Sequence, residues 1–292
     1  MKKKNNVLLI IIIFVTIILV INKFAQNDKE NFCIDKMIDN NLTADNSKTV
    51  LLIHGYPEPI YEDSYLYSFF KDRGYNIIAP YLFTSEFKLT KEETKKFIED
   101  KLNNKTPDVI VGVSMGGLIA PQIASDYSKA KLVLVATGPY VKTDIEILNK
   151  VVLQTQPTKL SSIFQFGRSI PTWLYSIFYK TFNYSKNIED KEKTQIEKHI
   201  RENWSCVKNI PVNEDMEVAS FLASTDNTEI LKKLSNKTIV FAGDGDIMMP
   251  MQLSEKLNEL IKNSKLIVSK SRSHYSVFTE ANFNDLDDFL RD

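Results

Sequence analysis

Residues 108–117, with the sequence Asp-Val-Ile-Val-Gly-Val-Ser-Met-Gly-Gly, decide the fold class of this chain. The stretch over residues 108–113 is almost wholly apolar, which is typical of a strand buried on both faces of a sheet. Residues 117–127 then predict a helix. A strand that passes so abruptly into a helix forces the residue at the turn, Ser114, into a strained backbone conformation. We expect this turn to lift the Ser114 hydroxyl above the carboxyl end of the strand.

Glycines stand two positions before and two positions after Ser114, at Gly112 and Gly116. They remove the side chains that would crowd such a turn, and the start of the following helix favours negative charge nearby. The pattern Gly-x-Ser-x-Gly is common by itself. Between a buried strand and a helix it indicates a nucleophilic serine, and a simple glycine-rich turn is the alternative.

The same alternation of apolar runs and helical patterns extends in both directions from this turn. Further strands are predicted over residues 50–53, 75–79, 131–136, 237–242 and 265–269. Helices are predicted over residues 61–73, 90–102 and 283–290. Apolar strands that alternate with helices indicate an α/β fold, with a mostly parallel sheet of about six strands and helices on both faces.

The alternation stops between residues 140 and 235, where four helical patterns follow one another. They cover residues 144–153, 163–182, 188–204 and 216–234. An all-helical insertion between two strands is typical of a lid, so the chain divides into a core of residues 49–139 and 236–292 and a lid of residues 140–235. Three roles stay open for the aromatic segment over residues 170–182: lining an apolar pocket, contact with a bilayer surface, or packing of the lid onto the core.

Residues 1–25 carry a targeting signal, in which three lysines at residues 2–4 precede an apolar run over residues 7–21. The run is short for a bilayer span and long for a cleaved signal peptide, and no small-residue cleavage site follows it. We predict an uncleaved transmembrane signal anchor, with a cleaved signal peptide and a buried core helix as alternatives. The lysines favour a cytoplasmic N-terminus, so the rest of the chain is expected on the extracytoplasmic side. A polar linker over residues 26–48, in which we predict one short strand, joins the two parts.

The composition argues against several other classes of protein. Lys and Arg together number 37, as do Asp and Glu, so the formal net charge is zero and we expect no nucleic-acid partner. The two cysteines, Cys33 and Cys206, lack the Cys-x-x-Cys spacing of zinc and redox sites, and we predict neither a metal nor a cofactor. If the domain is exported these cysteines can pair, and two unrelated thiols are the alternative.

A base for Ser114 must come from one of only three histidines in the chain. His274 lies in the loop after the last predicted strand, at the same edge of the sheet as Ser114, and we predict that it is the general base. His199 lies in a charged helical segment and has the pattern of a solvated side chain. His54 directly follows the first predicted strand, in the sequence His-Gly-Tyr-Pro.

A carboxylate must hold the base in the correct tautomer and stabilise its charged form. The strand predicted over residues 237–242 leads into the loop Gly-Asp-Gly-Asp, which places two aspartates at the expected edge of the sheet. Asp246 is the predicted acid because it lies one step further into the loop. Asp244, which has the pattern of a turn former beside glycine, and Asp144, beyond the fourth strand, are the alternatives.

The order of serine, aspartate and histidine, with a His-Gly turn upstream, resembles the α/β-hydrolase superfamily over residues 49–292. The resemblance implies an oxyanion hole made by the backbone amides of Tyr56 and Met115. It also implies that His54 and Gly55 support the oxyanion loop and take no direct part in the chemistry. The serine nucleophile argues against the haloalkane dehalogenase and epoxide hydrolase branches, which use an aspartate at that position.

These residues predict a serine hydrolase that attacks a carbonyl through Ser114 and forms an acyl-enzyme. The expected substrate is a small, partly apolar acyl compound with an ester bond. One alternative is a peptidase of the proline-iminopeptidase type, which would need lid acids to bind an amine; Glu189, Asp190, Glu214 and Asp215 are available but have the pattern of solvated faces. A hydrolase of carbon–carbon bonds or lactones is a second alternative, and a binding protein on a decayed hydrolase fold is a third.

Overall fold

The computed structural model describes residues 40–41, 47–84, 86–141, 171–183 and 211–291, together with short pieces between 193 and 210. The anchor predicted over residues 1–25 and the lid helix predicted over residues 144–153 lie outside these residues. In the described part of the chain, no helix has both the length and the apolar character that crossing a membrane requires.

The sheet has seven strands among the described residues, in the order β1-β3-β2-β4-β5-β6-β7. They are β1 (Asn40–Asn41), β2 (Thr49–Ile53), β3 (Asn76–Ile78), β4 (Val109–Val113), β5 (Lys131–Val135), β6 (Thr238–Gly243) and β7 (Ser264–Ser269). Strands β2 to β7 run parallel, which confirms the prediction of a six-stranded parallel sheet. The two-residue strand β1 pairs with β3 in the antiparallel direction, and it is the one short strand predicted within the linker over residues 26–48.

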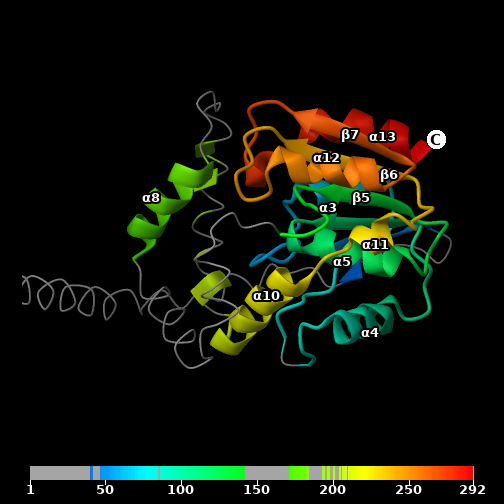
Figure 1. Cartoon of the computed structure of the whole chain (residues 1–292), viewed down its shortest axis with the longest axis horizontal. Coiled ribbons are helices and arrows are strands. Elements are labelled where there is room, and N and C mark those ends of the chain that lie inside the picture. The colour runs from blue at the N-terminus through cyan, green and yellow to red at the C-terminus, as the bar shows by residue number, and fades with distance from the viewer. Residues whose placement is uncertain are drawn as a thin grey trace, which may run out of the picture.

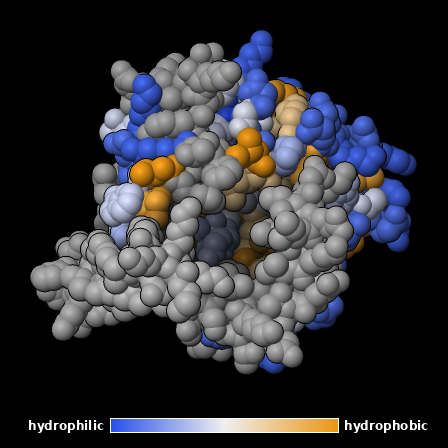
Figure 2. Space-filling view, turned by 60° about the vertical axis from the view of Figure 1, so that its left-hand side comes forward, coloured by the Kyte–Doolittle hydropathy of each residue, from blue (hydrophilic) through white to orange (hydrophobic). Residues whose placement is uncertain are grey.

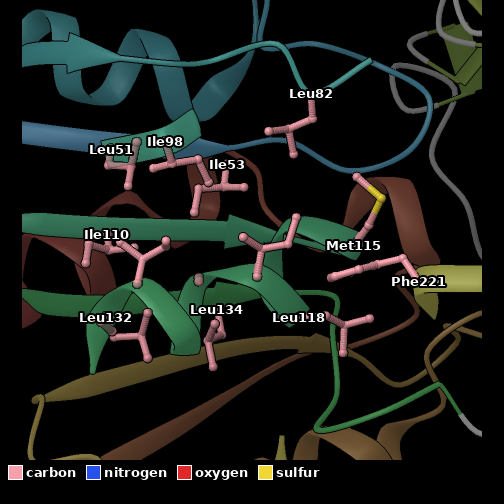
Figure 3. Packing of buried hydrophobic residues seen from close by; sticks show 14 of the residues in the cluster. Leu51, Ile53, Leu82, Ile98, Ile110, Met115, Leu118, Leu132, Leu134 and Phe221 are labelled. Carbon is pink, nitrogen blue, oxygen red and sulfur yellow. The ribbon is translucent and has the colours of Figure 1, made fainter. Parts of the chain in front are cut away.

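Helices cover both faces of the sheet, as predicted (Figure 1). The core helices are α3 (Tyr65–Asp72), α4 (Lys91–Leu102), α5 (Met115–Ala124), α12 (Met251–Leu260) and α13 (Phe283–Arg291). Because successive side chains of a strand point to opposite faces, Leu51 and Ile53 of β2 pack with α4, α5 and α12 on one face (Figure 3). Val50 and Leu52 pack with α3 and α13 on the other face.

Helix α5 begins at Met115, two residues before its predicted start. Ser114 occupies the N-cap position, so β4 passes into the helix with a single residue between them. Every residue of α5 is buried. The turn at Ser114 is therefore held between a buried strand and a buried helix.

The described part of the insertion between β5 and β6 contains α8 (Thr172–Asn183), α10 (Val212–Ser224) and α11 (Thr228–Leu231). The prediction of a single helix over residues 216–234 is wrong, because the helix is interrupted between the end of α10 at Ser224 and the start of α11 at Thr228. At the break Asp226 pairs with Tyr140 in an isolated antiparallel bridge. The buried side chain of Asn227 donates a hydrogen bond to the carbonyl oxygen of Leu118 on α5. Such contacts compete with a continuous helix.

Cys206 is buried and disulfide-bonded. The hydroxyl of Tyr61 lies 3.0 Å from its Sγ atom. The only other cysteine in the sequence is Cys33, which lies outside the described residues. The bond favours the paired alternative over two unrelated thiols.

Candidate active site

The backbone of Ser114 is held in an uncommon conformation by three hydrogen bonds. Its φ of 51° lies in the left-handed region, which residues other than glycine rarely adopt. The Ser114 N–H donates to the carbonyl oxygen of Val135 at 2.9 Å. Its carbonyl oxygen accepts from the N–H of Gly117 at 2.9 Å and from the hydroxyl of Thr137 at 2.8 Å. The end of β5 thus holds the turn on one side, and the start of α5 holds it on the other.

The glycines around Ser114 are required because other atoms occupy the space that their side chains would need. A Cβ atom added to Gly116 would lie 2.1 Å from the carbonyl oxygen of Ile53, and one added to Gly112 would lie 2.5 Å from that of Gly116. Gly117, which we did not predict as a site residue, is equally constrained, since an added Cβ would lie 2.4 Å from the Cγ2 atom of Thr137. Close packing therefore allows no side chain at these three positions.

The side chains of Ser114, His274 and Asp246 form one hydrogen-bonded chain. The Nε2 atom of His274 lies 2.9 Å from the Oγ atom of Ser114, and its Nδ1 atom lies 2.7 Å from the Oδ2 atom of Asp246. Both His274 and Asp246 are buried. When Nδ1–H donates to the carboxylate, Nε2 is the acceptor for the Ser114 hydroxyl. The residues follow the ends of β4, β6 and β7, so the parallel sheet brings them to one edge.

Asp246 is also fixed through its second carboxylate oxygen. The Oδ1 atom accepts hydrogen bonds from two backbone N–H groups of its own loop, at 2.9 and 2.8 Å. Asp244 instead accepts a hydrogen bond at 2.6 Å from the N–H of Ser271, in the loop that follows β7. The structure therefore brings Asp246, and not Asp244, to His274. The remaining alternative, Asp144, lies outside the described residues.

His54 is buried and joins two loops. Its Nδ1 atom lies 2.6 Å from the carbonyl oxygen of Gly55, and its Nε2 atom accepts the N–H of Leu82 at 2.9 Å. Because Nε2 accepts, Nδ1 carries the ring proton and donates to Gly55. Burial lowers the pKa of His54 to about 4, against a smaller opposing effect of the bond to Gly55, so the ring is neutral near pH 7. These contacts suit the predicted support of the oxyanion loop.

The burial of a neutral His54 is expected to make the protein less stable in acid. A histidine in the unfolded chain has its ordinary pKa of 6.5, whereas the pKa of His54 in the fold is about 4. The stability that depends on this group is therefore present above pH 6.5 and is lost as the pH falls toward 4. Between pH 7 and pH 5 the free energy of unfolding should fall by about 2 kcal/mol more in the wild type than in His54→Asn. Urea denaturation at both pH values measures the difference, and equal losses in the two proteins would contradict it.

The loop after β2 lies directly against Ser114. A Cβ atom added to Gly55 would lie 3.2 Å from the Cβ atom of Ser114 and 3.8 Å from its Oγ atom. Met115 is the first residue of α5, so its N–H belongs to the helix start, where amides have no acceptor within the helix. These positions suit an oxyanion hole beside Ser114. The amides of Tyr56 and Met115 remain the predicted donors.

A cavity of about 510 Å³ opens over Ser114 and His274. Its described lining comes mainly from residues 54–66 and 274–280. This volume is typical of sites for small molecules. Within the described ranges, no group of three or more His, Cys, Asp or Glu side chains is placed to hold a metal ion.

Helix α8 packs aromatic side chains against the loop that carries His274. The ring centroid of Tyr275 lies 4.7 Å from that of Tyr179 and 5.2 Å from that of His274. Tyr175 stacks on Trp204 with 4.2 Å between ring centroids. Burial raises the pKa of the Tyr175 and Tyr179 hydroxyls, so both stay neutral near pH 7.

The opposite side of α8 exposes large apolar side chains. Trp173 is 61% exposed and Ile177 is 56% exposed. The space-filling view in Figure 2 shows apolar side chains near a hollow on this side of the molecule. Packing onto the core is thus one role of the aromatic segment over residues 170–182, while the pocket and bilayer roles stay open.

Two of the lid acids are buried, so the prediction that they are solvated is wrong. Glu214 and Asp215 lie in the first turn of α10 and are 7% and 3% exposed. For Asp215 the reason is a long-range contact, in which its carboxylate accepts a hydrogen bond from the Tyr56 hydroxyl at 2.8 Å. Neither acid belongs to the described lining of the cavity. Glu189 and Asp190 lie outside the described residues.

Two supporting side chains in the site were missed because local sequence gives no signal for them. Thr137 follows a strand and resembles any other strand-end threonine, yet it holds the carbonyl oxygen of Ser114. Asp215 is separated from Tyr56 by 159 positions. Its contact with the oxyanion loop exists only once the insertion has folded against the core.

A family model described as the alpha/beta hydrolase fold matches residues 48–281. The chain belongs to this family. The matched range contains the six parallel strands β2 to β7, the insertion and the loops of Ser114, Asp246 and His274. It confirms the family resemblance that the sequence motifs indicated. No curated protein sequence matches the chain.

Solved structures of α/β hydrolases with different activities share this fold. A bromoperoxidase from Bacillus anthracis is 22% identical with a TM-score of 0.61, and the match covers 84% of this chain and 92% of that one. An esterase from Thermogutta terrifontis is 18% identical with a TM-score of 0.65, covering 87% and 92%. A meta-cleavage product hydrolase from Pseudomonas fluorescens IP01 is 21% identical with a TM-score of 0.56, covering 84% and 88%. At these identities the likeness shows the fold alone.

Proposed function

We propose that this α/β hydrolase is a serine hydrolase that cleaves esters through an acyl-enzyme intermediate. The observation that carries the proposal is the hydrogen-bonded chain from Ser114 through His274 to Asp246, beneath a cavity for a small molecule. Acyl transfer requires a nucleophile, a base and an orienting carboxylate in this order and within hydrogen-bond distance. The left-handed φ of Ser114 supports the same role, because it is the strained turn that exposes a nucleophilic serine.

The reaction proceeds in two halves. The Oγ atom of Ser114 attacks the carbonyl carbon of the ester while His274 takes the hydroxyl proton at Nε2. The bond from the carbonyl carbon to the alcohol oxygen then breaks, and His274 gives the proton to the departing alcohol. In the second half His274 takes a proton from water, the hydroxide attacks the acyl carbon, and the acid leaves as Ser114 regains its proton.

The remaining groups of the site stabilise charge during both halves. Asp246 accepts from Nδ1–H and stabilises the charged imidazole while His274 holds the extra proton. The amides of Tyr56 and Met115 hold the oxyanion, and each such donor is worth roughly 3–4 kcal/mol in the transition state.

The cavity supports a small, partly apolar and uncharged or cationic substrate. Its described lining includes Ile60, Leu66 and Val135, and its described charged residues are all acids, so an anionic substrate would be repelled. Of the four lid acids, the two that the structure describes, Glu214 and Asp215, do not belong to the described lining of the cavity, which counts against a peptidase that binds its substrate amine through them.

We also propose that the catalytic domain lies outside the cytoplasm, held by a membrane anchor at residues 1–25. The apolar run over residues 7–21 and the lysines before it support this orientation. The disulfide of Cys206 supports it independently, because such bonds persist in oxidising compartments. Cys33, the only other cysteine in the sequence, lies in the linker after the anchor and is the expected partner of Cys206.

A fluorophosphonate probe that does not cross membranes tests the function and the location together, on cells that produce the full chain. We expect labelling of intact cells, with the adduct mapped to Ser114 by mass spectrometry and abolished in Ser114→Ala. Labelling that requires permeabilised cells would overturn the location and leave the function intact. If the protein stays unlabelled in both preparations, or if Ser114→Ala is still labelled, the proposed function is wrong.

A further inference from the structure

Lid helix α10 contacts both segments that carry the predicted oxyanion donors. At the first segment, the hydroxyl of Tyr56 donates to the Oδ1 atom of Asp215 at 2.8 Å. At the second, Phe221 of α10 belongs to the same buried cluster as Met115, and Figure 3 shows its ring directed toward Met115 and Leu118. One helix of the insertion therefore bonds to the side chain of Tyr56 and shares the buried cluster of Met115, the two residues whose amides would bind the oxyanion.

The bond between Tyr56 and Asp215 is partly buried. Asp215 is 3% exposed, and the ring of Tyr56 packs edge-on against Phe83 with 5.5 Å between centroids. A hydroxyl that donates to a carboxylate makes a stronger bond than one between neutral groups. The loss of that donor removes a charge-assisted bond from a buried carboxylate, so the pair is costly to separate. The position of the Tyr56 side chain is thus coupled to the position of α10.

The oxyanion loop is held at both of its ends. His54 ties the start of the loop to the N–H of Leu82, and Gly55 lies against Ser114. Tyr56 is the next residue, and its side chain ties the far end of the loop to α10. The amide of Tyr56 lies between these two attachments, so a change at either one would alter its direction.

We propose that Asp215 is a positioning residue, which orients the amide of Tyr56 through the Tyr56 hydroxyl and so makes the oxyanion hole depend on helix α10 of the lid. This inference rests on the proposed serine-hydrolase function. An oxyanion donor acts mainly on the charge that develops in the transition state. Misplacement of the Tyr56 amide therefore lowers kcat and leaves KM nearly unchanged.

A double-mutant cycle with Tyr56→Phe and Asp215→Ala tests the coupling in the full chain. Each single variant should lower kcat for p-nitrophenyl butyrate by about 10-fold to 100-fold, with KM within about 3-fold, and should slow fluorophosphonate labelling of Ser114 equally. The double variant should lose no more than either single variant, because both changes remove the same bond. Asp215→Asn keeps an acceptor oxygen and should recover most of the lost kcat.

Glu217→Ala is the matched control. Glu217 also lies on α10 and accepts a backbone N–H, that of Leu89 at 3.0 Å, but this bond does not involve the oxyanion loop. The variant should lower Tm as Asp215→Ala does, with kcat within about 2-fold of the wild type. Losses of kcat that multiply in the double variant, or equal losses for Glu217→Ala and Asp215→Ala, would overturn the positioning role. A wild type that the probe does not label would instead refute the hydrolase function, and this inference with it.

Discussion

Replacing His274 with alanine is expected to lower kcat by about 10⁶-fold while the protein stays folded. The change removes the nitrogen that lies 2.9 Å from the Oγ atom of Ser114, so the hydroxyl must lose its proton to water. Because Ser114 and His274 act as one unit, the double variant Ser114→Ala with His274→Ala should be no less active than either single variant. Steady-state hydrolysis of p-nitrophenyl butyrate measures the loss, and circular dichroism confirms the fold.

Control variants test the choice of His274 as the base and of Asp246 as its carboxylate partner. His199→Ala should keep kcat within about 2-fold, since His199 lies in a segment with the pattern of a solvated helix. Asp246→Asn should lower kcat by about 10⁴-fold, because an amide donor beside Nδ1 favours the wrong tautomer. Asp244→Asn should keep kcat within about 3-fold, because Asp244 accepts from the N–H of Ser271 and not from His274. Equal losses of kcat in His274→Ala and His199→Ala, or in Asp246→Asn and Asp244→Asn, would contradict these roles.

Gly116→Ala is expected to lower the free energy of unfolding by about 3 kcal/mol or more, a large part of the stability of a typical domain. The added Cβ would lie 2.1 Å from the carbonyl oxygen of Ile53 and 2.7 Å from that of His54. Both oxygens belong to the backbone at the end of β2, which is paired on both sides by β3 and β4 and cannot move aside as a side chain can. Activity should be lost as well, because Met115 and the oxyanion loop must separate.

Gly55→Ala is the comparison for this steric argument. Its added Cβ would lie 3.2 Å from the Cβ atom of Ser114, so the neighbouring atoms need to move by only a few tenths of an ångström. We expect a loss of about 1 kcal/mol in stability together with a lower kcat. Urea denaturation measures both variants. If Gly116→Ala had the stability of the wild type, the turn at Ser114 would have room for a side chain, which would contradict this prediction.

Hydrophobic patterning was sufficient to predict the six parallel strands, because a strand covered on both faces must be apolar along its length. It was not sufficient to place β1 within the linker over residues 26–48, because Asn40 and Asn41 carry no apolar pattern and pair with β3 through their backbone. The start of α5 was misplaced by two residues for a related reason. The glycines after Ser114 look like a loop in sequence, but in the fold they are the first turn of a buried helix.

The insertion was less predictable than the core. A continuous helix was predicted where α10 and α11 are separate, because the bond from Asn227 to Leu118 joins residues that are 109 positions apart. The acids Glu214 and Asp215 fit the preference for negative charge in the first turn of a helix, and that pattern is the same whether the turn is solvated or buried. Whether these acids are buried depends on the core residues that pack against α10, such as Tyr56.

The sequence by itself determined the fold class and the short list of candidate catalytic residues. One serine at a strand-to-helix turn, three histidines and one Gly-x-x-Asp loop allow few possible sets of nucleophile, base and acid. The tertiary structure alone decided that Asp246 and not Asp244 meets His274, that His54 is buried and neutral, and that Asp215 contacts Tyr56. The physical reason is that residue type and local hydrophobic pattern are properties of the sequence itself. Distance, burial and hydrogen-bond partners arise only when loops far apart in sequence meet at one edge of the sheet.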